Sequence, residues 1–360
     1  MLVYFSILII CCVICFVTQN NDSPKRTLCV LFGLIWCMIA FQEGWGGDYM
    51  SYVNSFDYLK GQSISDLLVD DSHGEVGYKI FLSLCPSYRI SFWIGILIYC
   101  VGLAFFFYKF VPRRWWPLML FFLFVDRPMM MGAISSYPRM AIANAALIFS
   151  YYFLSKGNRI GYIAIVFLAM FFHKSIFFLL PFFFVKGDPI KISLSKGMIV
   201  CVLIAFLSIL MPSTWVSIVD NILSGVSELE DYALHYIDST QNNDTKGISL
   251  IFQFYWVYLL LRLLRDGSLD TTEYIILKFA LIRIVFDLLP AIGMSVRVFY
   301  YLDYAFFAGM MVVLSHMSNK DSNKWALIVS LLIMYFYFGF MTFSKDPFWI
   351  ASWAKYHYIF

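Results

Sequence analysis

The feature that most constrains this chain is a series of apolar runs separated by short polar loops. The runs lie at about 2–18, 27–41, 91–110, 115–131, 138–154, 160–172, 174–185, 197–211, 248–264, 271–290, 296–316 and 325–343. Hydrophobic residues make up 61% of the 360 positions and charged residues 14%, whereas a soluble domain carries about 25% charged residues. A soluble core of this length cannot bury so much apolar surface. We therefore expect an all-α polytopic membrane protein.

The lengths of the runs refine this expectation. Several are shorter than the roughly 20 residues that a perpendicular transmembrane helix needs, so tilted, broken or re-entrant helices are expected in the middle of the chain. We expect about 12 transmembrane or re-entrant helices in one integral membrane domain over residues 1–360. Two long polar segments, 42–90 and 212–247, interrupt the apolar runs.

The distribution of Lys and Arg predicts how the chain is oriented. One alternating set of loops holds 14 basic and six acidic residues, and the other set holds ten basic and fifteen acidic residues. The basic residues of the first set are Lys25, Arg26, Lys109, Arg113, Arg114, Lys156, Arg159, Lys186, Lys191, Lys196, Arg262, Arg265, Lys320 and Lys324. We expect this set to be cytoplasmic, with both termini and both long polar segments extracytoplasmic. A net charge of +3 gives no reason to expect a nucleic-acid partner.

Three polar residues, His173, Lys174 and Ser175, lie in the middle of the apolar stretch 164–185. Burying such groups in hydrocarbon is costly. If residues 160–185 formed one span, the basic loop after it would move outside, against the charge pattern. We therefore expect two short helical limbs, with the three polar residues at an outward-facing tip or break, where polar groups can line a cavity.

A first candidate site residue is Arg139, in the stretch SSYPRMAIANAALIF (135–149). Pro138 suits the first turn of a helix, so Arg139 is predicted at an outward-facing helix start. Free N–H groups and the helix dipole attract an anion there, and an arginine can bind a phosphate through two parallel hydrogen bonds. The alternative is an arginine that reaches toward lipid headgroups.

A second candidate is Arg297, which opens a helix after Pro290 and Gly293 interrupt the preceding apolar run. Its spacing to three tyrosines, at i+3, i+4 and i+7, places them on one helix face. These are Tyr300, Tyr301 and Tyr304. A cation beside aromatic rings can hold a phosphate and let a sugar ring stack. The alternative is an aromatic belt at the membrane interface.

Other titratable groups are weaker candidates. Asp48 follows two glycines in GWGGDYMSY (44–52) beside Tyr49, and Glu75 is a second carboxylate. Both could bind sugar hydroxyls or lie in ordinary solvated turns. His173 titrates near neutrality and could be a base, a phosphate donor or a helix cap.

Two further pairs are interpreted structurally. Arg283 and Asp287, four residues apart on a predicted helix, are expected to pair with each other. Cys12-x-x-Cys15 has the spacing of metal ligands, but it lies in a lipid-facing pattern, so we expect no metal there.

The order of these motifs resembles that of a known family. They are Gly47-Asp48-Tyr49, Glu75-Val76-Gly77-Tyr78, Arg139 with Ala141 and Ala143, Phe172-His173-Lys174-Ser175, and Arg297 with Tyr301. Together they resemble the EpsG/Wzy-like polysaccharide polymerases of bacterial envelopes over roughly residues 40–310. The family often has Gln after the helix-opening Arg, where this chain has Met140. The resemblance implies a GT-C-like glycosyltransferase architecture.

The resemblance also implies a reaction at the outer face of the bacterial cytoplasmic (inner) membrane. An acceptor hydroxyl of one lipid-linked repeat unit attacks the anomeric carbon of a glycan on polyprenyl diphosphate, which leaves. Arg139 and Arg297 would stabilise the diphosphate, and His173, or failing that Asp48, would take the proton. Substrate-binding roles would fall to Lys174, Glu75, Tyr49, Tyr300, Tyr301 and Tyr304.

The partners implied are the polyprenyl-diphosphate-linked donor and acceptor, membrane lipid and a chain-length regulator protein, with no metal or cofactor. Two other classes compete with this interpretation. A lipid-linked oligosaccharide flippase fits the number of apolar runs, although no inverted repeat is visible. A non-catalytic scaffold for envelope assembly is the third class. The sequence does not indicate which sugars or linkage are involved.

Overall fold

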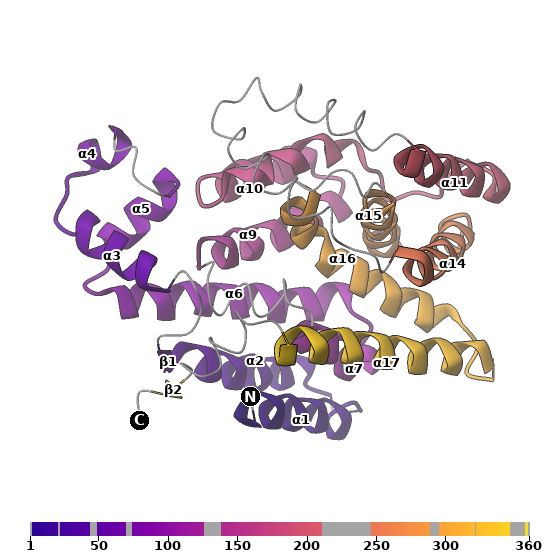
Figure 1. Cartoon of the computed structure of the whole chain (residues 1–360), viewed down its shortest axis with the longest axis horizontal. Coiled ribbons are helices and arrows are strands. Elements are labelled where there is room, and N and C mark those ends of the chain that lie inside the picture. Colours follow the sequence, from indigo (N-terminus) through magenta and orange to yellow (C-terminus); the bar gives the residue numbers. More distant parts are fainter. Residues whose placement is uncertain are drawn as a thin grey trace. The chain divides into compact units, whose positions relative to one another are not determined.

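A computed structural model describes residues 2–20, 22–43, 49–69, 74–125, 138–210, 246–288, 295–320, 322–345 and 357–358. The described residues are predominantly helical (Figure 1). The α-helices are α1 (Leu2–Val17), α2 (Pro24–Ala40), α3 (Tyr49–Leu59), α4 (Ile64–Val69), α5 (Val76–Ser83), α6 (Tyr88–Phe110), α7 (Trp116–Val125), α9 (Pro138–Ser155), α10 (Arg159–Met170), α11 (Leu194–Leu210), α14 (Lys246–Leu264), α15 (Thr271–Asp287), α16 (Ser295–His316) and α17 (Ser322–Lys345). Two 3-10 helices are η1 (Arg113–Trp115) and η3 (Lys174–Phe184), and the short strands β1 (Gln42–Glu43) and β2 (His357–Tyr358) pair antiparallel.

Over its described residues, each predicted apolar run coincides with a helix, so the expectation of a helical protein is confirmed. The run predicted at 138–154 is α9, for example, and the runs at 160–172 and 174–185 are α10 and η3. No apolar run indicated α3, α4 and α5, which lie in the polar segment 42–90.

Among the described residues, one helix is both long and apolar enough to cross a membrane by itself. This helix is α6, with a mean hydropathy of 2.3 over its best window. Shorter apolar stretches are Ser6–Val17, Arg159–Met170, Lys174–Phe184, Leu194–Leu207, Ile251–Leu264 and Ser322–Ile333. The number of about 12 spans, the GT-C-like architecture and the single membrane domain stay predictions.

The chain divides into two compact units. The first comprises Met1–Phe183 and Leu314–Phe360, and the second comprises Phe184–Val313. In the first unit α6 packs along both α2 and α9, and α10 packs on the other side of α9. Figure 1 shows α2, α6, α9 and α10 as successive members of one stack. The N-terminal helix α1 packs on α2 and α7.

A glycine permits the close approach of α6 to α9. A Cβ on Gly102 would lie 2.9 Å from the Cα of Ala145, closer than real Cβ contacts come. Next to it, the rings of Phe105 and Phe149 stack with centroids 4.7 Å apart. Small residues at one level and aromatic rings at the next thus set the spacing of the two helices.

The turn between α9 and α10 follows from its sequence. Gly157 adopts a positive φ of 71°, a conformation that costs other residues free energy. Asn158 then caps α10, because its side chain accepts a hydrogen bond from the Gly161 N–H at 2.8 Å. The short connection makes α9 and α10 antiparallel neighbours.

In the second unit, α14 packs against α11 and α15. Asp270 and Glu273 form a reciprocal capping box at the start of α15. Within this unit the Nε of Arg283 donates to Asp303 of α16 at 2.6 Å. We expected Arg283 to pair with Asp287. The structure shows a pairing with Asp303, and because the Asp287 side chain lies outside the described residues, the pairing with Asp287 stays a prediction.

Candidate functional site

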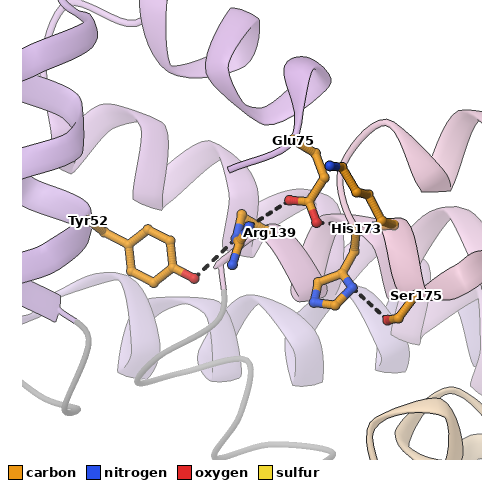
Figure 2. Close-up of polar contacts among 6 residues, drawn as sticks. Tyr52, Glu75, Arg139, His173 and Ser175 are labelled. Atoms are coloured by element: carbon orange, nitrogen blue, oxygen red, sulfur yellow. Dashed lines mark hydrogen bonds and ion pairs between the residues drawn. The ribbon is translucent and has the colours of Figure 1, made fainter. Parts of the chain in front are cut away.

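Three segments of the first unit meet around Arg139 (Figure 2). They are the residue that precedes α5, the start of α9, and the break between α10 and η3. Figure 2 shows Arg139 between Tyr52 and Glu75, and the His173 ring turned toward Ser175. Glu75, Arg139 and His173 were separate candidates in the sequence, and the structure brings them together.

The predicted break in 160–185 is confirmed. Helix α10 ends at Met170, Phe171 and Phe172 form a turn, and the chain continues from Lys174 as the 3-10 helix η3. Pro181 lies inside η3; a proline in an α-helix interior would remove a hydrogen bond and clash with the preceding turn. His173 is buried at the break. The outward orientation of the break stays a prediction.

Helix α5 docks onto this break through its backbone. The Gly77 N–H donates to the Phe171 carbonyl at 2.9 Å. A Cβ at position 77 would lie 2.7 Å from both the Cβ and the carbonyl oxygen of Phe171. Only a glycine therefore allows α5 to lie this close to the turn.

We expect Gly77→Ala to lower the melting temperature of the purified protein. The added methyl meets backbone, so α5 must move away from Phe171, and overpacking of this kind costs about 1–3 kcal/mol. The matched control is Gly33→Ala in α2, where an added Cβ meets nothing within 4 Å and alanine favours the helix by roughly 0.5–1 kcal/mol. Equal melting temperatures for Gly77→Ala and the wild type would contradict the close docking.

Glu75 joins the three segments. Its Oε2 accepts from Nη1 of Arg139 at 2.6 Å, and its Oε1 accepts from the backbone N–H of Lys174 at 3.1 Å. Each carboxylate oxygen therefore binds a different segment. Glu75 and Arg139 are 9% and 8% exposed, and a buried charge requires such a partner.

The surroundings keep Glu75 ionised. Burial raises the pKa of its carboxyl, but the charge of Arg139, the charge of His173 when it is protonated, and the Lys174 N–H lower it by more, so the pKa lies below its ordinary value. Because the pKa of Glu75 is lower in the folded state than in the unfolded state, its ionised carboxylate contributes fully to the free energy of unfolding at pH values above the unfolded-state pKa. This contribution is lost as the pH falls through the folded value.

Arg139 is held on two sides. Its Nε donates to the Tyr52 hydroxyl at 3.2 Å, and its guanidinium lies 5.8 Å from the centre of the Tyr52 ring. Glu75 engages Nη1, whereas Nη2 makes no hydrogen bond to a residue that the structure describes. The described part of α9 begins at Pro138, and Arg139 is its second residue; that Pro138 lies in the first turn of the helix stays a prediction.

Tyr52, the last residue of the stretch GWGGDYMSY (44–52), is a member of the site that the sequence did not single out. It lies on α3, is buried, and meets Tyr78 of α5 edge to face at 5.9 Å. The spacing of Tyr49, Tyr52 and Phe56 is that of one helix face. That spacing could have indicated a buried aromatic face, because Tyr52 and Phe56 are both core residues.

Ser175 is a second residue whose role was not anticipated. Its hydroxyl lies 2.8 Å from Nδ1 of His173, a distance that fixes the orientation of the imidazole ring. Because the two residues are two positions apart at the start of η3, the 3-10 turn itself creates the contact. Lys174 between them has an exposed side chain.

The other predicted site residues are distributed as follows. Tyr49 opens α3 and contacts Tyr88 edge to face at 5.7 Å, while Asp48 lies outside the described residues. Arg297 and Tyr300 belong to α16, but their side chains lie outside the described part of the chain. Tyr301 and Tyr304 are buried residues of α16. Their participation in one site with Arg139 stays a prediction.

These features define a class: an all-helical, apolar protein of the membrane type, with a buried cluster of charged residues. A family model narrows the class, because the EpsG family model matches residues 25–358. The chain therefore belongs to the EpsG family, as its motifs predicted. No curated protein and no solved structure matched the chain. Membership assigns a polysaccharide-polymerase type of role, which is glycosyltransferase-like and acts on lipid-linked glycans in general.

Proposed function

We propose that this protein polymerises polyprenyl-diphosphate-linked oligosaccharide repeat units at the outer face of the bacterial cytoplasmic membrane. The product would be an O-antigen, a capsule or an exopolysaccharide. Family membership supports the general role. The observation that carries the site is Arg139, a buried guanidinium at a helix start that is oriented by Tyr52 and Glu75.

In the proposed reaction an acceptor hydroxyl forms a bond to the anomeric carbon of the donor glycan. The bond between that carbon and the diphosphate oxygen breaks, polyprenyl diphosphate leaves, and the hydroxyl proton passes to a base. The transition state thus needs positive charge near the diphosphate and a proton acceptor near the attacking oxygen.

Arg139 suits the first role. Glu75 and Tyr52 hold Nη1 and Nε, which orients Nη2 without using its two N–H groups. A preoriented donor stabilises developing charge at no reorganisation cost. The negative charge of Glu75 offsets the positive charge of Arg139, so a diphosphate meets a smaller net positive charge. The favourable contribution of Glu75 is therefore to orient the guanidinium. In this proposal two arginines, Arg139 and Arg297, supply the positive charge that a bound metal ion would otherwise supply.

His173 suits the second role better than Glu75 does. A general base works best with a pKa near the working pH, and the charge of Arg139 beside Glu75 lowers the pKa of that carboxyl from its ordinary value, away from neutrality. A histidine titrates close to neutrality without any shift. When Nδ1–H donates to the Ser175 hydroxyl, the lone pair lies on Nε2, and in this proposal Nε2 takes the proton. Asp48 is the second candidate base.

The remaining predicted residues complete the proposal. Lys174, Tyr49 and the carboxylate of Glu75 would border the sugar-binding region, together with Tyr300, Tyr301 and Tyr304 of α16. The site would face outward, with both termini and the segments 42–90 and 212–247 extracytoplasmic. A chain-length regulator protein is a proposed partner.

The test is the glycan that accumulates on the lipid carrier when the gene is deleted. Loss of the polymerase should leave single repeat units on the outer face of the membrane, where an added impermeant glycosidase can remove them. Single units that the glycosidase cannot reach in intact cells would instead indicate a flippase. Continued polymerisation with altered chain lengths would indicate a scaffold, and either result would overturn the proposal.

A further inference from the structure

Three lysines at or just beyond the ends of three helices of the first unit gather around two tyrosines. Lys25 at the start of α2 and Lys109 at the end of α6 lie 5.6 Å and 4.9 Å from the centre of the Tyr108 ring. Lys109 and Lys156, which follows α9, each lie 5.7 Å from the centre of the Tyr152 ring. We call Lys25, Tyr108, Lys109, Tyr152 and Lys156 the lysine–tyrosine strip.

The strip concentrates positive charge. Among the residues that the structure describes, none of the three ammonium groups has a carboxylate within ion-pair distance. A cation at the face of an exposed ring gains only about 0.5–1 kcal/mol, and neighbouring like charges repel each other. An anion among the three lysines would convert that repulsion into attraction.

An apolar surface leads directly to the strip. On α6 the exposed side chains of Ile94, Leu97, Ile98 and Val101 recur at the spacing of one helix face. That face continues through Phe105 to Tyr108, which is 40% exposed. Phe105 in turn contacts the Tyr152 ring edge to face at 5.3 Å. An exposed hydrocarbon face therefore ends in tyrosines and then in lysines, the order of groups at a membrane interface.

We propose that the lysine–tyrosine strip binds the phosphate of an anionic phospholipid whose acyl chain lies along the exposed face of α6. The positively charged strip and the exposed apolar face of α6 are continuous. A phospholipid contacts both, the strip with its phosphate and the apolar face with its acyl chain, whereas a free anion needs only the charge. Each lysine near an anionic membrane surface contributes about a fivefold gain in affinity. The strip lies at the C-terminal ends of α6 and α9, whereas Arg139 opens α9. The two are roughly 25 Å apart along that helix, so the proposal does not depend on the proposed function.

The test measures binding to the full-length protein purified in a neutral detergent. Phosphatidylglycerol is titrated as the anionic probe, phosphatidylcholine as the neutral lipid, and inorganic phosphate as the free anion; native mass spectrometry counts the lipid that stays bound. The variant Lys25→Gln/Lys109→Gln/Lys156→Gln removes the three charges of the strip. The control Lys60→Gln/Lys191→Gln/Lys196→Gln removes three exposed lysines elsewhere, so both variants have the same net charge.

We expect phosphatidylglycerol, but not phosphatidylcholine, to bind the wild type and the control, with affinity on the order of a hundredfold lower in the strip variant. Tyr152→Leu should lose part of that affinity while keeping the contact with Phe105. Equal binding to the strip variant and the control would overturn the proposal. So would inorganic phosphate binding as tightly as the lipid, or cross-linking of two copies through cysteines introduced on α6, because either result assigns the surface to another occupant.

Discussion

Replacing Arg139 by lysine is expected to reduce polymer synthesis by about tenfold to a hundredfold at a normal level of membrane-inserted protein. A charged hydrogen bond is worth roughly 1.5–3 kcal/mol, which corresponds to that loss if the bond strengthens in the transition state. Lysine keeps the charge but cannot bind Glu75, Tyr52 and a diphosphate at the same time, because it lacks the planar guanidinium. The measurement is the length of lipid-linked glycan per unit of inserted protein.

The matched control is Arg159→Lys. Arg159 also opens a helix, α10, but it is exposed, and an arginine that only reaches lipid headgroups tolerates lysine at little cost. Arg139→Ala would be harder to interpret, since it leaves Glu75 buried without its partner and costs about 3–5 kcal/mol of stability. Full-length polymer from Arg139→Lys would mean that this arginine is an anchor and that the site lies elsewhere.

The role of Glu75 can be separated from that of Arg139. In the double variant Arg139→Lys/Glu75→Gln both partners of the ion pair change, and their effects should not add, since residues in direct contact are coupled. If Glu75 only orients the guanidinium, the double variant should be no less active than Arg139→Lys alone. A further loss in the double variant would assign Glu75 a contact with substrate of its own.

The sequence predicted the local features of this site because their causes are local. A proline is tolerated in a helix chiefly in its first turn, so a helix that continues from Pro138, as α9 does, followed directly. The break at His173 followed from the charge pattern of the loops on either side. The 3-10 form of η3 was not predicted; a proline inside an apolar run indicates a break without specifying which helix type follows.

The sequence could not predict which residues would become partners. Glu75 and Arg139 are 64 positions apart, and nothing in either motif indicates the other. The contact between Gly77 and Phe171 joins backbones 94 positions apart, and it depends on the absence of a side chain at position 77. Such contacts are set by the packing of whole helices, which local patterns do not encode. For Asp48 and the Arg297 side chain, both outside the described residues, the predicted roles are unchanged.

Replacing His173 by alanine is expected to lower polymerisation by roughly 10²- to 10⁴-fold, the usual contribution of a general base. His173→Gln should be no better, because an amide can donate a hydrogen bond but cannot take the proton at neutral pH. Ser175→Ala should have a smaller effect, since it leaves the base in place and removes the hydroxyl that orients it. The measurement is the initial rate of glycan extension in membranes supplied with lipid-linked repeat units, over a range of pH.

The pH dependence of the rate distinguishes a catalytic role of His173 and its neighbour Ser175 from a purely structural one. In the wild type the rate should fall on the acid side as His173 becomes protonated, and Ser175→Ala should move that limb because it changes the surroundings of the imidazole. Ser175→Thr restores the hydroxyl and should restore the profile, whereas a purely structural serine would alter the rate without moving the limb. The matched control is Ser193→Ala, an exposed serine outside the site. A near-normal rate in His173→Ala would remove this histidine from the mechanism and make Asp48 the leading candidate for the base.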